Sequence, residues 1–247
     1  MSFNDREEKI LEILRERYSI RSSELAKLLY VSVSTLRRDL QKLEEKNLII
    51  KEHGRCKLSS RLKEEKISYN LRQQQRGIAK NKMAKEAVKF VKDGDNIMLD
   101  GSSSAYSIIH FLDEFRDLLV ISNSAKVSFA LSETNIYNIS TGGKMVKGTV
   151  SFVGQEAINA IKNYNADIMF FSCRGLTDNG YLTDEDKEEN DVRKEMMKYA
   201  DKKVALIDSS KVGKKYLYNL CHVSEVDEII CDEELPDYIL KQMKKTY

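Results

Sequence analysis

Apolar residues recur at helical spacing three times within the first sixty residues, each time between polar positions. A spacing of three and four residues places apolar side chains on one face of a helix that packs on a core. The apolar positions of the three predicted helices are Ile10, Ile13 and Leu14, then Leu25, Leu28 and Leu29, then Val33, Leu36, Leu40 and Leu43. Ser22 and Ser32 are favourable N-caps for the second and third helices, whereas Ser19 and Ile20 interrupt the pattern after the first. Two short helices joined by a tight turn predict a helix-turn-helix.

The polar face of the third predicted helix carries side chains that suit nucleic acid. At about 100° per residue, Arg38 lies almost opposite the apolar stripe, and Arg37 projects sideways, where a phosphate is the expected partner. Hydroxyl, amide and cationic groups of this kind bind base edges and phosphates in the major groove. The flanking positions are Ser34, Thr35, Gln41 and Lys42. The helical pattern alone leaves open a protein-interaction domain with a solvated, charged face.

A strand, a turn at Gly54 and a second strand are predicted over residues 48–58, which is the pattern of a wing. The wing contributes four further candidate DNA contacts, namely Lys51, His53, Arg55 and Lys57.

The chain after the wing changes character twice. Residues 59–75 are polar and rich in glutamine, so we place a domain boundary near residue 60 and predict a helical linker over residues 61–79. From residue 80 to residue 247, apolar runs alternate with helical patterns, which predicts an α/β domain with a mostly parallel sheet covered by helices on both faces. The predicted strands are Asn96–Leu99, Leu118–Ile121, Ile136–Ile139, Ile168–Phe171, Val204–Ile207 and Ile229–Ile230.

Polar segments follow several of these strands. Ligands bind at the carboxyl ends of parallel strands, so the segments are expected to converge on one pocket. The first, Asp100-Gly101-Ser102-Ser103-Ser104, precedes a helical stretch and combines hydroxyls with helix-start N–H groups, as a phosphate site does. An ordinary serine-capped helix is the alternative for this segment alone. The other predicted ligand contacts are Asn123, Gly142, Gly143, Lys144, Arg174 and Lys211.

Composition narrows the class of protein. The net charge is +2, but residues 1–60 hold 13 Lys and Arg against 10 Asp and Glu, so the basic excess lies in the predicted DNA-binding segment. The four cysteines have neither disulfide nor zinc spacing, and Cys221, His222 and Cys231 match no zinc pattern, so we expect no metal and no cofactor. No run approaches the ~18 apolar residues that span a bilayer. We therefore expect a cytoplasmic protein without a membrane partner.

The amino-terminal motifs resemble those of the DeoR family of transcriptional regulators. The resemblance rests on Ser23-Glu24-Leu25-Ala26, Val31-Ser32, Thr35-Leu36-Arg37-Arg38-Asp39-Leu40, Leu43-Glu44 and His53-Gly54, in that order and spacing. It implies that Ser32, Ser34, Thr35, Arg37 and Arg38 belong to a recognition helix. The family usually continues its wing as Arg-x-His-Gly-Gly-Ala, whereas here Lys51 replaces the arginine and Arg55-Cys56 follow His53-Gly54. We therefore expect the wing tip to contact DNA differently.

The rest of the chain resembles the family's sugar-phosphate sensor domain, whose fold is shared with ribose-5-phosphate isomerases and coenzyme A transferases. The resemblance covers the Asp100 loop, Ser122-Asn123-Ser124, Gly142-Gly143, Gly175, the helix from Asp191 to Ala200, and Asp208-Ser209-Ser210-Lys211. It implies that a phosphorylated sugar binds there. The position of Arg174 is not assigned by the family pattern, so its candidacy depends on its chemistry alone.

Three functions remain to be compared. The first is a regulator, a repressor of a sugar-catabolic operon, that binds a double-stranded DNA operator as a homodimer or homotetramer and responds to a sugar phosphate. The second is a sugar-phosphate isomerase-like enzyme fused to a DNA-binding domain, but Ser172-Cys173-Arg174-Gly175 stands where those isomerases carry an acidic cluster, so a general base is missing. The third is a DNA-binding module whose second domain only oligomerises. The sequence favours the first.

Overall fold

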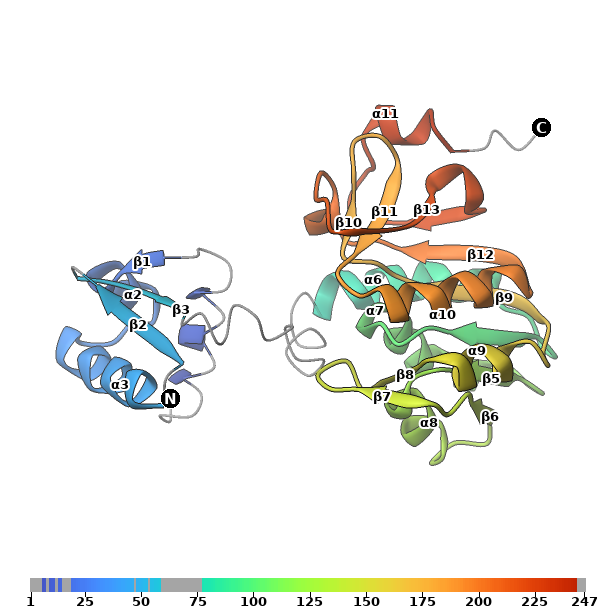
Figure 1. Ribbon diagram of the computed structural model, residues 1–247, viewed down its shortest axis with the longest axis horizontal. Helices are drawn as coiled ribbons and strands as arrows, with labels where there is room; N and C mark the ends of the chain where they lie inside the picture. The colour runs from blue at the N-terminus through green and yellow to red at the C-terminus, as the bar shows by residue number, and fades with distance from the viewer. Residues whose placement is uncertain are drawn as a thin grey trace. The chain divides into compact units, whose positions relative to one another are not determined.

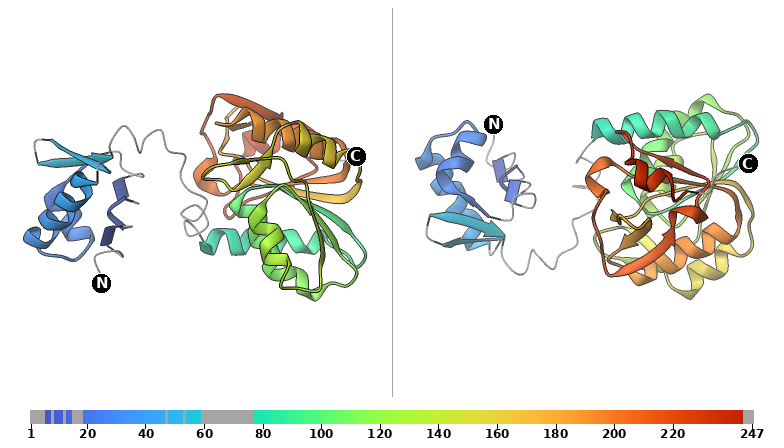
Figure 2. Two further views of the ribbon diagram at one scale, coloured as in Figure 1. Left: turned by 60° about the horizontal axis from the view of Figure 1, so that its bottom comes forward. Right: turned by 90° about the horizontal axis from the view of Figure 1, so that it is seen from above.

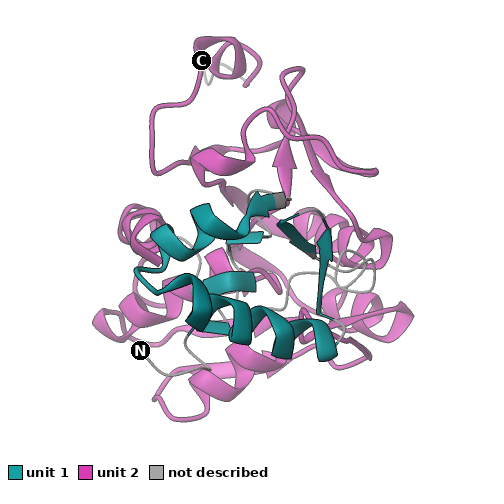
Figure 3. Ribbon diagram, turned by 90° about the vertical axis from the view of Figure 1, so that its left-hand side faces the viewer, with its two compact units in different colours: residues 1–66 teal, residues 67–247 magenta. Residues whose placement is uncertain are grey.

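The computed structural model describes residues 6–7, 9–11, 13–14, 19–46, 48–52, 54–58 and 77–243. The chain divides into two compact units, residues 1–66 and 67–247, which are distinguished by colour in Figure 3. Residues 61–76 of the predicted linker lie outside the described residues, and residues 77–79 belong to the first helix of the second unit.

The described part of unit 1 contains helical segments and a three-stranded antiparallel sheet of order β1-β3-β2 (Figure 1). Its elements are β1 (Ser19–Arg21), α2 (Ser22–Leu28), α3 (Val33–Glu45), β2 (Ile49–Glu52) and β3 (Arg55–Leu58). Residues 6–7, 9–11 and 13–14 are also helical, and Ile10 and Leu14 join the core that Leu25, Leu36, Leu40 and Leu43 form. These elements confirm the predicted winged helix-turn-helix.

Several positions in unit 1 differ from the predicted pattern. Ser22, predicted as the N-cap of the second helix, is instead its first residue; the N-cap is Arg21, and no side chain caps the helix. The break expected at Ser19 and Ile20 is strand β1, in which Ile20 pairs with Cys56 and is buried. Leu28 and Val33, assigned to the apolar stripes of the second and third helices, are 42% and 54% exposed because each lies beside the open turn between α2 and α3. Asp39 is buried in the place that helical spacing would give to an apolar residue.

Unit 2 is built on a six-stranded sheet of order β14-β12-β9-β4-β5-β6, and all five pairings are parallel. The strands are β4 (Asn96–Leu99), β5 (Leu119–Ser122), β6 (Tyr137–Ser140), β9 (Ala166–Phe171), β12 (Ala200–Leu206) and β14 (Glu228–Ile230). Each corresponds to one of the six predicted strands, so the predicted α/β class with a parallel sheet is confirmed.

Helices cover both faces of this sheet, as Figure 2 shows in the view from above. On one face lie α6 (Gly77–Ala87), η1 (Val88–Phe90), α7 (Ser103–Tyr106), η2 (Ser107–Glu114) and α8 (Ala125–Leu131). On the other lie α9 (Gln155–Ile161) and α10 (Lys187–Lys198), and the short helix α11 (Asp237–Leu240) joins the core on that side through Ile239. Successive strand residues alternate between the two resulting cores, so Phe170 packs with the first set and Phe171 with the second. Each buried phenylalanine contributes about 1.5–3 kcal/mol.

Short antiparallel strands, which the sequence pattern did not predict, complete the second face. A hairpin is formed by β7 (Lys144–Val146) and β8 (Ser151–Val153), and a three-stranded sheet by β10 (Gly175–Leu176), β11 (Tyr181–Asp184) and β13 (Tyr218–His222). Leu176, Leu182 and Leu220 of that sheet pack in the same core as Phe171. Two single turns, η3 (Ser209–Lys211) and η4 (Val223–Glu225), complete the fold. In the part of the chain that the structure describes, no helix is long and apolar enough to cross a membrane.

Candidate functional site

Helix α3 presents a cationic face to solvent. Arg37, Arg38 and Lys42 are exposed, and Gln41 is exposed as well, with its amide donating to Glu45 Oε1 at 3.3 Å. Neither Arg37 nor Arg38 has an ion-pair partner among the described residues. Two guanidinium groups are therefore available on this face, as the sequence predicted for Arg38.

The first turn of α3 is held by a cluster of three hydroxyls. Ser32 caps the helix, since its Oγ accepts from the backbone N–H of Thr35 at 3.1 Å. The same oxygen lies 2.9 Å from Ser34 Oγ and 2.8 Å from Thr35 Oγ1. These three candidate DNA contacts are thus brought together, but their hydroxyls already bind one another.

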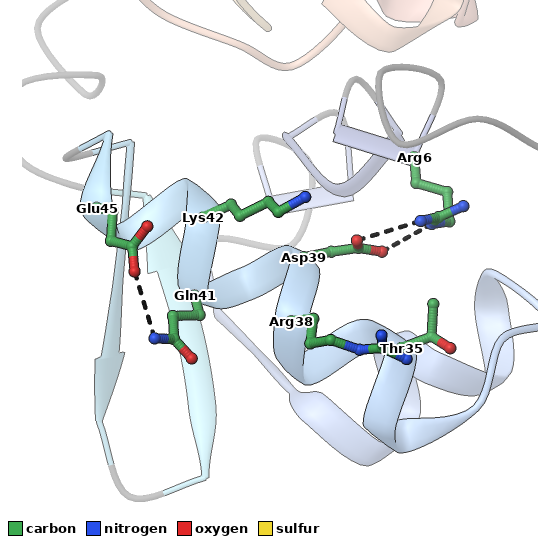
Figure 4. Close-up of a pocket in the computed structure, with 7 residues that line it drawn as sticks. All are labelled: Arg6, Thr35, Arg38, Asp39, Gln41, Lys42 and Glu45. Carbon is green, nitrogen blue, oxygen red and sulfur yellow. Dashed lines mark hydrogen bonds and ion pairs between the residues drawn. The ribbon is translucent and has the colours of Figure 1, made fainter.

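Arg6 binds α3 beside its cationic face and so helps to orient the helix. Its Nε and Nη2 donate to Asp39 Oδ2 and Oδ1 at 2.7 and 3.2 Å, a bidentate pair that explains why Asp39 can be buried (Figure 4). A pocket of about 430 Å³ lies along this side of the helix. Its lining residues are Arg6, Thr35, Arg38, Asp39, Gln41, Lys42 and Glu45.

The wing carries its cations in ion pairs. Lys51 Nζ lies 2.7 Å from Glu44 Oε2, and Lys57 Nζ lies 2.7 Å from Glu52 Oε2. The hydrogen bond from Lys51 lowers the pKa of Glu44. Both pairs are at least partly exposed, so exchanging the carboxylate for a DNA phosphate costs little. Arg55 is exposed, and His53, the remaining predicted wing contact, lies outside the described residues.

In unit 2, the carboxyl ends of the parallel strands share one edge of the sheet; we call the segments that follow β4, β5, β6, β9 and β12 the rim. Asp100, directly after β4, is fully buried, and both its oxygens are engaged. Oδ1 accepts from the N–H of Ser102 at 3.0 Å, which shapes the serine loop, and Oδ2 accepts from Arg193 Nε at 2.7 Å. Ser102 in turn caps α7, accepting from the N–H of Ala105 at 3.1 Å, and Ser103 and Ser104 are buried beside it.

The cation that binds Asp100 of the rim is Arg193 of α10. The sequence pattern did not identify this residue. It is buried, and besides Asp100 it binds Asp184 Oδ2 at 2.9 Å and Glu189 Oε2 at 3.5 Å. Burial opposes its ionisation, but the attraction of Asp184, Asp100 and Glu189 is stronger, so the pKa of Arg193 is raised. One guanidinium therefore ties α10 to the ends of β4 and β11.

Ser172 joins two of the predicted ligand segments. Its N–H donates to Asp100 Oδ2 at 3.4 Å, and its Oγ accepts from Lys211 Nζ at 2.7 Å. Lys211 also lies 3.5 Å from Asp208 Oδ2. The structure thus places the Asp100 loop and Lys211 next to each other, with the lysine ammonium at the end of β9.

Asn123 contributes an unsatisfied acceptor to the rim. Its Nδ2 donates to the carbonyl of Phe152 at 2.9 Å, but its buried Oδ1 has no hydrogen-bond partner among the described residues. Gly101 lies beside it: a Cβ at Gly101 would stand 3.8 Å from Asn123 Nδ2 and 2.6 Å from Ser151 Cβ. Gly101 is therefore required by the close approach of Ser151, whose Oγ donates to Glu189 Oε1 at 2.7 Å.

Gly143, Lys144 and Arg174 were also predicted to contact the ligand, but their contacts within the protein explain why these residue types stand there. A Cβ at Gly143, with φ +111°, would stand 2.7 Å from the carbonyl oxygen of Val153, whereas Gly142, with φ +60°, has open space beside it. Lys144 is exposed and pairs with Glu188 at 2.8 Å, a hydrogen bond that raises the pKa of Lys144. Arg174 Nε lies 3.7 Å from Asp184 Oδ1 and 3.5 Å from Glu185 Oε2. Of these residues, Arg174 is the one linked to the Arg193 cluster, through Asp184.

Comparisons with known proteins agree with the division of the chain into two units. Residues 6–61 match the family model described as DeoR-like helix-turn-helix domain, and residues 76–233 match DeoR C terminal sensor domain. An uncharacterized HTH-type transcriptional regulator of Bacillus subtilis (strain 168) is 34% identical over 241 residues, which is 97% of this chain and 93% of that protein. The L-fucose operon activator of Escherichia coli (strain K12) is 29% identical over 92% of this chain and 94% of its own. The transcriptional repressor GlcR of B. subtilis is 31% identical over 90% of this chain and 86% of its own.

Likeness to solved structures is partial. Ribose 5-phosphate isomerase A from Methanocaldococcus jannaschii aligns over 54% of this chain and 53% of its own, with a TM-score of 0.41 and 24% identity. The delta subunit of eIF2B from Chaetomium thermophilum aligns over 67% of this chain and 60% of its own, with a TM-score of 0.49 and 16% identity.

Proposed function

The chain belongs to the DeoR family of helix-turn-helix transcriptional regulators, and we propose that its α3 face and wing bind an operator whose affinity is set by a sugar phosphate at the rim. Relatives carry the names of both activators and repressors of sugar operons. We propose repression of a sugar-catabolic operon for this chain, in the cytoplasm, where operator DNA is located.

The observation that carries the DNA-binding proposal is the pair of exposed guanidinium groups on α3. A helix in the major groove reads bases with such groups, most often by a bidentate contact between arginine and guanine. Arg38 is the expected base reader, and Arg37 and the wing cations Lys51, Arg55 and Lys57 are the expected phosphate contacts. A single winged helix reads few base pairs, so we propose that a homodimer or homotetramer binds repeated half-sites.

Arg38→Ala is expected to weaken binding to the selected operator by about 1–3 kcal/mol and to relax sequence preference at one position. Lys57→Ala is the matched control, because a lost phosphate contact weakens binding to all sequences alike and lowers the salt slope by about one. Fluorescence anisotropy over a series of salt concentrations measures both effects. Unchanged operator affinity of the Arg38 variant would contradict the assignment of α3 as the reading helix.

The effector proposal is supported by four features of the rim. The serine loop offers the N–H groups of Ser103 and Ser104, since that of Ala105 already donates to Ser102 Oγ, and Lys211 offers a cation for a phosphate. Asn123 Oδ1 offers a buried acceptor for a sugar hydroxyl, because a buried polar atom without a partner is costly. Gly142 leaves open space at the neighbouring strand end.

Thermal denaturation with a panel of sugar phosphates tests this proposal. One member is expected to stabilise the protein by about 2.7 kcal/mol at a hundred times its Kd, with the unphosphorylated sugar inactive. Lys211→Met should remove the stabilisation, and Lys215→Met, at an exposed lysine nearby, should keep it. If no compound of the panel stabilises the protein, the second unit serves oligomerisation alone.

The arrangement of the rim supports a sensor rather than an isomerase. A general base needs a carboxylate that is free to take a proton from the substrate. Both oxygens of Asp100 are engaged, and Asp208 binds Lys211 and both the N–H and the hydroxyl of Ser210. Burial raises the pKa of the Cys173 thiol to about 12, so it does not supply a thiolate nucleophile. Turnover of a stabilising sugar phosphate would favour the enzyme instead.

Control of the operator requires two arrangements of the DNA-binding units with different effector affinities. Moving such an equilibrium from mostly bound to mostly released takes a differential affinity of about 10⁴, or about 5.5 kcal/mol. A charge-assisted hydrogen bond to a phosphate contributes about 1.5–3 kcal/mol. A few such bonds, summed over two subunits that respond together, therefore reach the required differential free energy.

A further inference from the structure

Large hydrophobic side chains are exposed at one place in the described part of unit 1. Leu28, Tyr30 and Val33 are 42%, 96% and 54% exposed, and all three lie at the turn between α2 and α3. Tyr30 also has a φ of +53°, a conformation that is strained for a bulky side chain. Single exposed apolar residues need no explanation, but a contiguous group beside a cationic helix face indicates a contact surface.

Val33 is the member of this group that belongs to α3, the helix that carries the proposed DNA contacts. It is the first residue of α3, the part of a recognition helix that contacts base edges. The neighbouring polar side chains of this turn, Ser34 and Thr35, have their hydroxyls bound to Ser32 Oγ. Among the described residues, the exposed group that the first turn leaves without a partner is therefore the branched aliphatic side chain of Val33.

We propose that Val33 packs against the C5-methyl group of a thymine in the major groove and thereby selects thymine at one position of each half-site. The thymine methyl is the apolar feature that the major groove offers, and aliphatic side chains contact it. This assignment depends on the proposed operator binding and adds one specificity-determining residue to it. Among the polar residues of the predicted recognition set, only Thr35 has a methyl group of its own, and Thr35 is half-buried, whereas Val33 is exposed and wholly aliphatic.

DNA rather than a protein partner is the occupant that the surroundings favour. Lys27, at the end of α2, and Arg37, one helical turn after Val33, are exposed, so a partner for Val33 that also meets these cations combines an apolar group with negative charge. A thymine flanked by backbone phosphates has that combination.

The experiment replaces thymine by deoxyuridine, which removes the methyl group and keeps the base pair. An operator is first selected in vitro with the full chain, and each thymine is then replaced in turn. For the wild-type protein, one replacement per half-site is expected to weaken binding about fourfold, the effect of one methyl-sized group at about 0.8 kcal/mol. Val33→Ala, which keeps helix propensity, should bind the thymine and deoxyuridine operators equally at that position and should keep every other preference.

Leu28→Ala is the matched control, an equally apolar and exposed residue on α2, and should retain the fourfold thymine preference. The proposal is overturned if no replacement affects the wild-type protein, or if the preference survives in Val33→Ala or disappears in Leu28→Ala. In the first of these cases a protein partner becomes the better occupant of the exposed group. Selection of no sequence by the wild-type protein would instead reject the proposed operator binding itself.

Discussion

Replacing Arg193 by methionine is expected to lower the free energy of unfolding of the second unit by about 3–5 kcal/mol. The guanidinium is the shared partner of Asp100, Asp184 and Glu189, all of them buried. Methionine fills similar volume but leaves three carboxylates without this partner in a region of low polarisability. The loss therefore comes from uncompensated charge rather than from a cavity, and urea denaturation followed by circular dichroism measures it.

Two control variants separate this effect from other causes. Arg193→Lys keeps the charge but not the planar fork that reaches several carboxylates, so it should lose less than Arg193→Met. Lys144→Met removes one partner of the exposed pair with Glu188 and should leave the free energy of unfolding almost unchanged, because solvent screens that pair. A loss below about 1 kcal/mol for Arg193→Met would show that the buried cluster does not depend on this residue.

Gly143→Ala is expected to destabilise the second unit by roughly 3 kcal/mol, from a strained φ and an overlap with backbone together. The new Cβ would stand 2.7 Å from the carbonyl of Val153 and 3.2 Å from the N–H nitrogen of Ala157. Both contacts are backbone atoms of β8 and α9, which cannot turn aside as a side chain can. The shift of the urea midpoint measures this loss.

Gly142→Ala is the control for the steric part of that loss. It also has a positive φ, but nothing lies within 4 Å of its added Cβ, so only the left-handed conformation costs energy, about 1–2 kcal/mol. Equal losses of unfolding free energy for the two variants would mean that the backbone of β8 and α9 moves aside at little energetic cost. A larger loss at Gly143 would assign this glycine to packing rather than to the approach of a ligand.

The sequence predicted the parallel sheet well because buried parallel strands are continuous apolar runs. Asn96–Leu99 was predicted to the residue, and Phe170 and Phe171 lie in a run that no solvated face interrupts. The strands β11 and β13 were not predicted because they mix polar with apolar residues, although they are as long as the predicted β4. The strand β10 has only two residues and gives no pattern at all. Pattern reasoning detects continuous apolar runs, and these strands contain none.

The residues of the candidate site were predicted in part, namely those in the segments that follow a predicted strand. Asp100, Asn123 and Lys211 follow strands, so their convergence could be expected from a parallel sheet alone. Arg193 could not be found in this way, because it lies 93 residues from Asp100 and within a helix whose other residues are mostly charged. Likewise, the burial of Asp39 depends on Arg6, a partner 33 residues away that no local periodicity indicates.

The strand order of the second unit also bears on how the chain folds. The central pair β4 and β9 is brought together across a separation of 71 residues at Asn96 and Asp167, whereas the first unit closes its sheet and core within residues 10–58. Folding rates fall as contacting residues lie further apart in sequence. During synthesis the winged helix-turn-helix emerges first and has only short loops to close, so it can reach its native structure while β9 is still being translated.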